Sequence, residues 1–218
     1  MDTHITVLAP GMDDLRYWLA NEDWYLSGYT RKWLQHTPPE EAAEVLAEIA
    51  ADAQPEPRGA WQLFLLFLTW FSLSGSIGPG PARRKAGIRA AVLLARMGDS
   101  RALEPLVRVY ETVRWRQSRY HELIESALIR LLASPSARPG LRPHVSVIND
   151  LARRVWSLGG GRRDLDPGAA DLLVAALKVL ASPGVEGDLT LVREIAGFHS
   201  TARCRAGVAE AARSLLRR

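Results

Sequence analysis

The side chains able to perform acid–base or metal chemistry are scattered along this chain of 218 residues. His121 and Glu125 are four positions apart, so on a helix they share one face. A zinc site needs three or four ligands, and no second His or Cys lies near this pair in the sequence. We therefore expect both side chains to lie on a solvated helix face, and we expect no metal site.

No arrangement of catalytic or cofactor-binding residues is recognisable in the sequence. The HExxH, CxxC and GxSxG patterns are absent. The glycines at 159–161 precede two arginines but lack the GK[ST] ending of a phosphate loop, and Asp164 and Asp166 lack the closing glutamate of a calcium loop. We expect 159–168 to be an inter-helix loop and Cys204 to be a packing residue. The chain is therefore expected to hold no catalytic set and no cofactor.

Basic residues form two clusters. Arg83, Arg84 and Lys85 occupy the predicted start of a helix, where positive charge costs about 0.3–1 kcal/mol per residue and free N–H groups favour an anion. Two alternatives do not involve an anion: the helix begins after this cluster, or the acidic N-terminal part of the chain neutralises the charge of the cluster. The second cluster surrounds Trp115 near a helix end. The predicted binding surface consists of Arg83, Arg84, Lys85, Arg89, Arg114, Trp115, Arg116 and Arg119.

Charge is divided unevenly along the chain. Residues 1–80 hold four basic and eleven acidic side chains, a net of −7, whereas residues 81–218 hold 24 and 13, a net of +11. Most of the basic residues are arginine, which suits phosphate or carboxylate recognition but also follows from codon bias in a GC-rich genome. The sign changes at a Gly- and Pro-rich break near residue 80. We place the main boundary there, between an acidic, aromatic-rich region (1–80) and a basic region (81–218), within one continuous structural unit.

Apolar residues recur at helical spacing almost throughout, so the predicted fold class is all-α. Thr37 is the expected N-cap of a helix that starts at Pro38-Pro39 and buries Ala42, Val45, Leu46 and Ile49. A second helix is expected over 58–73, whose 13-residue apolar run (61–73) is too short to span a bilayer. The segment 5–9 is the one faint strand candidate.

Helix pairs repeat after residue 80. Segment 88–109 predicts a helix, a turn at Gly98-Asp99 and a second helix. Segments 122–137 and 171–184 each predict a helix followed by a Ser-Pro turn, and 205–218 predicts the first helix of another unit. The turns are 36 and 48 residues apart, which is the spacing expected of an α-solenoid.

The segment IRAAVLLARMGDSRALEPLV resembles a bacterial HEAT-like repeat of the type found in phycobilin lyase subunits, with an Arg-Ala-Ala entry, a Gly-Asp turn and a second helix. Residues 202–206 echo that entry. The resemblance covers about residues 84–218 and implies a right-handed α-solenoid of HEAT-like helix pairs. We expect residues 1–80 to form its N-terminal helical cap, because a solenoid exposes the apolar flank of its terminal repeat.

Aromatic residues in the N-terminal part favour a packing role. Trp18, Tyr25, Tyr29 and Trp33 lie on one face if a single helix carries them all. Such a face packs the cap onto the solenoid or, alternatively, forms an exposed surface for a partner.

HEAT-like repeats imply a fold and a binding habit rather than a reaction. We expect a non-enzymatic scaffold or adaptor that binds a protein partner through its groove. The alternative is nucleic-acid binding, with an architecture resembling that of the HEAT-like alkylpurine DNA glycosylases, and a weaker alternative is a bilin-lyase-like subunit. A single cysteine and the lack of a secretory signal favour the cytoplasm.

Overall fold

The computed structural model describes residues 10–21, 28–53, 81–114, 119–158, 164–182, 189–199 and 201–217. These ranges are helical and contain no strand, which confirms the all-α fold class. The predicted helix at 58–73 and the strand candidate at 5–9 lie outside them. The helices are α1 (Met12–Asn21), α2 (Tyr29–His36), α3 (Pro39–Ala50), α5 (Pro81–Met97), α6 (Leu103–Arg114), α7 (Arg119–Ala133), α8 (Arg138–Leu141), α9 (Val145–Ser157), α10 (Pro167–Leu180), α11 (Thr190–Ala196) and α12 (Arg203–Leu216), with 3₁₀ turns η1 (Ser100–Ala102) and η2 (Arg142–His144).

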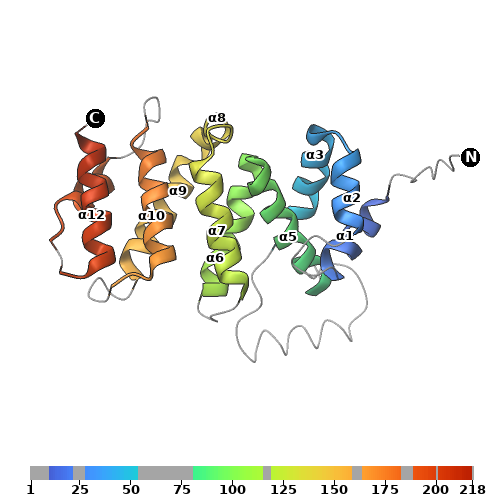
Figure 1. Ribbon diagram of the computed structural model, residues 1–218, viewed down its shortest axis with the longest axis horizontal. Helices are drawn as coiled ribbons and strands as arrows, with labels where there is room; N and C mark the ends of the chain where they lie inside the picture. Colours follow the sequence, from blue (N-terminus) through green and yellow to red (C-terminus); the bar gives the residue numbers. More distant parts are fainter. Residues whose placement is uncertain are drawn as a thin grey trace, which may run out of the picture.

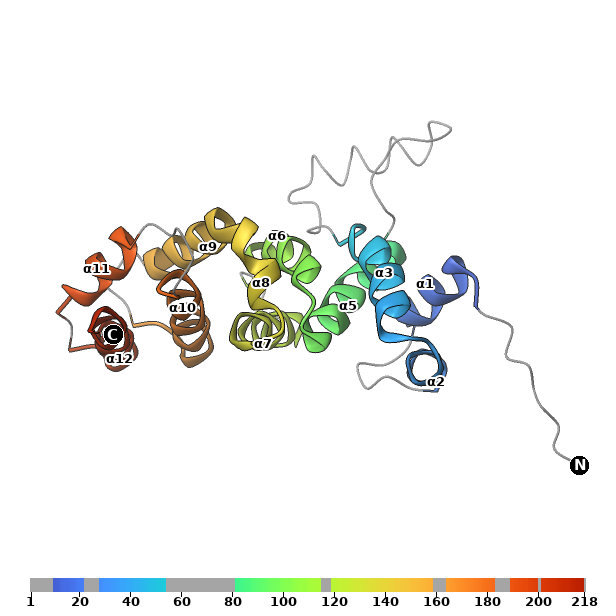
Figure 2. The same cartoon turned by 90° about the horizontal axis from the view of Figure 1, so that it is seen from above.

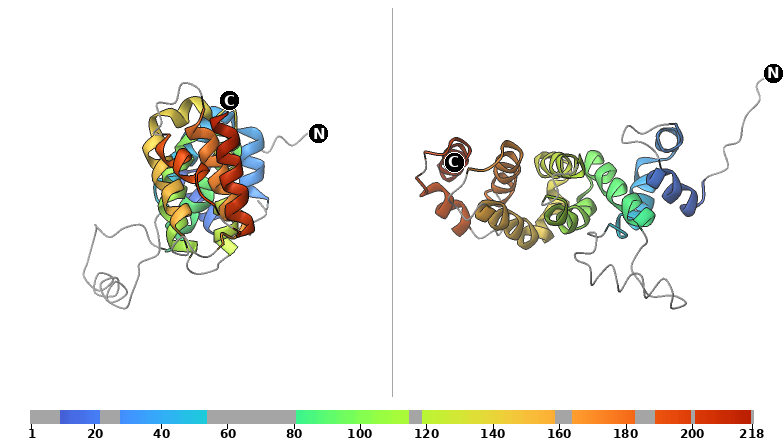
Figure 3. Two further views of the ribbon diagram at one scale, coloured as in Figure 1. Left: turned by 90° about the vertical axis from the view of Figure 1, so that its left-hand side faces the viewer. Right: turned by 90° about the horizontal axis from the view of Figure 1, so that it is seen from below.

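The helices form an elongated array that follows the order of the chain from α1 at one end to α12 at the other (Figure 1). Helices α5, α7, α10 and α12 pack one against the next and make one layer. Helices α6, α9 and α11 make a second layer, so the chain crosses repeatedly between the two (Figures 2 and 3). Helices α1 and α3 pack against α5, which joins the N-terminal helices to the array.

Local sequence explains where the helices begin and turn. Pro38, not Thr37, is the N-cap of α3, because Thr37 ends α2 by donating its N–H to the carbonyl of Trp33. The expected Gly98-Asp99 turn is confirmed: Gly98 has φ +76°, a conformation that favours glycine, and Asp99 accepts the N–H of Arg101 to start η1.

The repeated helices of the basic region are also confirmed, as α7, α10 and α12. Asp166 caps α10 by accepting the N–H of Ala169, and Pro167 occupies its first turn. The Ser134-Pro135 turn after α7 is present, whereas Pro183 lies outside the described residues. The Pro-rich stretch after Ser134 forms α8 and η2. Each of these short elements has a Pro in its first turn. A Pro there costs no intrahelical hydrogen bond, because the N–H groups of the first turn have no partner within the helix, so the prolines are compatible with helical structure in this stretch.

The core continues from α1 to α12 and is rich in Ala and Leu. Ala42, Leu46 and Ile49 of α3 are buried as expected, and Val45 is partly buried against them. Helix α5 approaches the chain just after α3 closely at Gly87. A Cβ on Gly87 would lie 2.7 Å from the carbonyl carbon of Asp52 and 2.9 Å from the Cα of Ala53, so this contact requires glycine.

Candidate functional site

The first basic cluster lies where the sequence predicts it, at the start of α5, of which Arg83, Arg84 and Lys85 are the third to fifth residues. Arg83 is exposed, whereas Arg84 and Lys85 are half-buried. The first turn of α5 contains no acidic residue to balance the charge. Because helix N-termini carry partial positive charge, three cations there leave an unusually positive helix start.

Arg89 does not lie on that surface. It is 8% exposed, and its guanidinium Nη1 donates a 2.5 Å hydrogen bond to the carbonyl oxygen of Leu19, in the last turn of α1. The i,i+4 relation to Lys85 therefore does not make a shared exposed face: α1 packs on α5 and covers Arg89. This residue is removed from the predicted binding surface.

The second cluster is described only in part. Arg114 is the last residue of α6 and Arg119 is the first of α7, while Trp115 and Arg116 lie outside the described residues. Alternation of helix direction brings the start of α5, the end of α6 and the start of α7 to one edge of the array, the lower edge in Figure 1. The fold thus brings the start of α5 to the same edge as the two helix ends at Arg114 and Arg119.

Two arginines of α12 bind the ends of second-layer helices, as Arg89 binds the end of α1. Arg205 is 1% exposed, donates to the carbonyls of Trp156 (3.0 Å) and Leu158 (2.7 Å) at the end of α9, and stacks 4.7 Å from the centroid of the Trp156 ring. Arg213 donates to the carbonyl of Ala196 at the end of α11. The last carbonyls of a helix lack intrahelical donors, so these guanidiniums satisfy them and complement the helix dipole.

Arg89 and Arg205 occupy equivalent places in the two Arg-Ala entries of the sequence. Each is followed by an alanine, then a small residue and a buried valine, Val92 or Val208. Each is buried and donates to a carbonyl at the end of an earlier helix. The entry arginine is therefore a structural residue that joins helices.

Asp164 stabilises the start of α12, the helix that carries Arg205. Its carboxylate accepts the N–H groups of Cys204 (3.1 Å) and Arg205 (3.0 Å) at the start of α12. These backbone hydrogen bonds, that of Cys204 first, lower the pKa of Asp164. The residue that resembled a calcium ligand is a helix cap supplied by a distant segment.

His121 and Glu125 also depart from expectation, because Glu125 is buried at 6% exposure rather than solvated. Its Oε1 accepts the hydroxyl of Tyr110 at 2.8 Å and lies 3.9 Å from Nε2 of His121, whose ring stacks on Tyr110. The Glu125 carboxylate packs against Gly168 in the first turn of α10. A Cβ at position 168 would collide with this carboxylate, so the contact requires glycine. Periodicity placed the pair on one helix face correctly, but it did not show that α6 and α10 cover that face.

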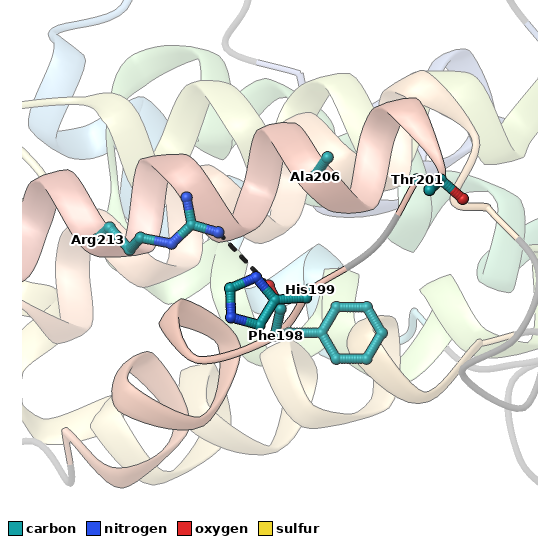
Figure 4. Close-up of a pocket in the computed structure, with 5 residues that line it drawn as sticks. All are labelled: Phe198, His199, Thr201, Ala206 and Arg213. Carbon is teal, nitrogen blue, oxygen red and sulfur yellow. Dashed lines mark hydrogen bonds between the residues drawn. The ribbon is translucent and has the colours of Figure 1, made fainter.

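A shallow pocket of about 290 Å³ lies between α11 and α12, lined by Phe198, His199, Thr201, Ala206 and Arg213 (Figure 4). Its cation is already engaged, because Arg213 donates to the Ala196 and Phe198 carbonyls and pairs with Glu210. The guanidinium that lines this pocket is thus held by groups of the chain itself.

The aromatic residues near the N-terminus do not share one helix. Helix α1 ends at Asn21 and α2 starts at Tyr29 after Gly28, whose φ is +57°. Trp18 and Tyr29 nevertheless stack, with ring centroids 5.2 Å apart, and Trp33 packs against the core. Tyr25 lies outside the described residues.

No family model, curated protein or solved structure matches this chain. Within the described ranges, no three His, Cys, Asp or Glu side chains are grouped to hold a metal ion. None of the helices described is long and apolar enough to cross a membrane.

Proposed function

We propose that this chain is a HEAT-like α-solenoid that serves as a non-enzymatic scaffold and binds a protein partner. The observation that carries the proposal is the equivalence of Arg89 and Arg205, two entry arginines 116 positions apart that make the same kind of inter-helix bond. A solenoid stacks similar helix pairs against their neighbours, so an inter-helix bond that recurs at equivalent positions supports this architecture. The two alternating layers are in keeping with this architecture (Figure 2).

The contacts of the arginines favour a protein partner over nucleic acid. Arg89, Arg205 and Arg213 bind backbone carbonyls, and a further set forms ion pairs within the chain: Arg16 with Asp13, Glu48 and Asp52, Arg101 with Asp99, and Arg153 with Glu194. A duplex-binding surface instead needs many free cations along one continuous stripe. The number of cations free to contact a polyanion is therefore lowered, because bonds within the described part of the chain engage at least five of the 24 basic side chains of residues 81–218: Arg89, Arg101, Arg153, Arg205 and Arg213.

Affinity capture with the tagged full chain, followed by titration with the recombinant captured protein, tests the scaffold. We expect one protein to bind saturably at a fixed stoichiometry. Replacing Arg83, Arg84 and Lys85 together by Ala is expected to weaken that binding. The matched control, Arg130→Ala with Arg138→Ala and Arg142→Ala, removes three exposed charges elsewhere and is expected to leave it unchanged. Failure of every captured protein to bind in purified form would contradict the proposal.

Nucleic-acid binding is the second candidate. It is favoured by the start of α5, whose first turn holds no acidic residue and which lies at the same edge as the end of α6 and the start of α7. Fluorescence anisotropy of a labelled duplex, and competition by heparin, between about 50 and 200 mM salt measures it. If this function is correct, the α5 triple variant lowers the slope of log K against log salt by about two to three, while the control triple does not. Absence of binding at 50 mM salt excludes it.

A further inference from the structure

We draw no further inference here: the strongest candidate, the surface patch at the α1–α2 end of the array where Tyr17 and Tyr29 are exposed, carries no proposal because nothing in the structure shows what covers it.

Discussion

The contact between α3 and α5 leads to a quantitative prediction at Gly87. In the Gly87→Ala variant the new methyl group meets backbone rather than flexible side chains: the carbonyl carbon of Asp52 at 2.7 Å, the Cα of Ala53 at 2.9 Å, and the Ala53 nitrogen closer still. Overpacking of this kind costs about 1–3 kcal/mol. The better helix propensity of Ala returns about 0.5–1 kcal/mol, so a net loss centred on about 1 kcal/mol, and at most about 2.5 kcal/mol, is expected.

The matched control is Gly207→Ala, the same substitution in a helix with no atom near the new Cβ. Here the propensity gain stands alone, and the free energy of unfolding is expected to rise by about 0.5–1 kcal/mol. Urea unfolding followed by circular dichroism at low micromolar concentration measures both variants. Thermal unfolding gives a second readout, since for a chain of this size each 1 kcal/mol corresponds to about 2–4 °C in Tm. The Tm of Gly87→Ala is expected to fall and that of Gly207→Ala to rise. A Gly87→Ala variant as stable as Gly207→Ala would refute the close approach of α3 and α5.

Further predictions concern the polar joints. Arg205→Met leaves two carbonyls at the end of α9 without their donor and is expected to lower the free energy of unfolding by about 2–4 kcal/mol in urea titrations. Tyr110→Phe removes the hydroxyl that donates to buried Glu125, at an expected cost of about 1–3 kcal/mol in the same assay. The pKa of Asp164 is lowered in the folded state, so its contribution to stability is full above the unfolded value of about 4 and is lost as pH falls through the folded value. Asp164→Asn should therefore unfold at lower urea at pH 7 and lose less stability on acidification, and equal urea midpoints for variant and wild type at pH 7 would contradict the cap.

The parts of the fold that periodicity governs were predictable. A stripe of Ala and Leu every three or four residues indicates a buried helix face, and Gly98-Asp99 specifies a turn with positive φ. The N-cap of α3 was wrong by one residue because Thr37 was needed to end α2. The shared face of Trp18, Tyr29 and Trp33 was conditional on one continuous helix, and periodicity alone does not reveal that α1 ends at Asn21 and α2 begins at Tyr29.

Polar residues were harder to predict, because their roles depend on contacts between distant segments. Nothing near Asp164 in the sequence indicates that it caps a helix forty residues later. For Glu125 the signal was present but ambiguous: a carboxylate beside apolar Ile124 and Ala127 suits an exposed face or a buried bond to Tyr110 equally well. The repeated Arg-Ala entry was the one usable signal, since recurrence at equivalent helix positions favours structure over binding.

Several arginines of this chain bind backbone carbonyls, so the net charge of the chain is a poor measure of the charge that a binding partner meets. A helix end needs donors for its last carbonyls, and a guanidinium provides several in one plane, which a lysine does not. In the described residues three arginines meet this need, Arg89 on α5 and Arg205 and Arg213 on α12. Such residues raise the net charge without adding much to the field felt by a ligand, because their charge is held against carbonyl dipoles within the fold. The charge that remains for recognition is the exposed fraction, and the start of α5 contributes to it without an acidic residue in the first turn of that helix.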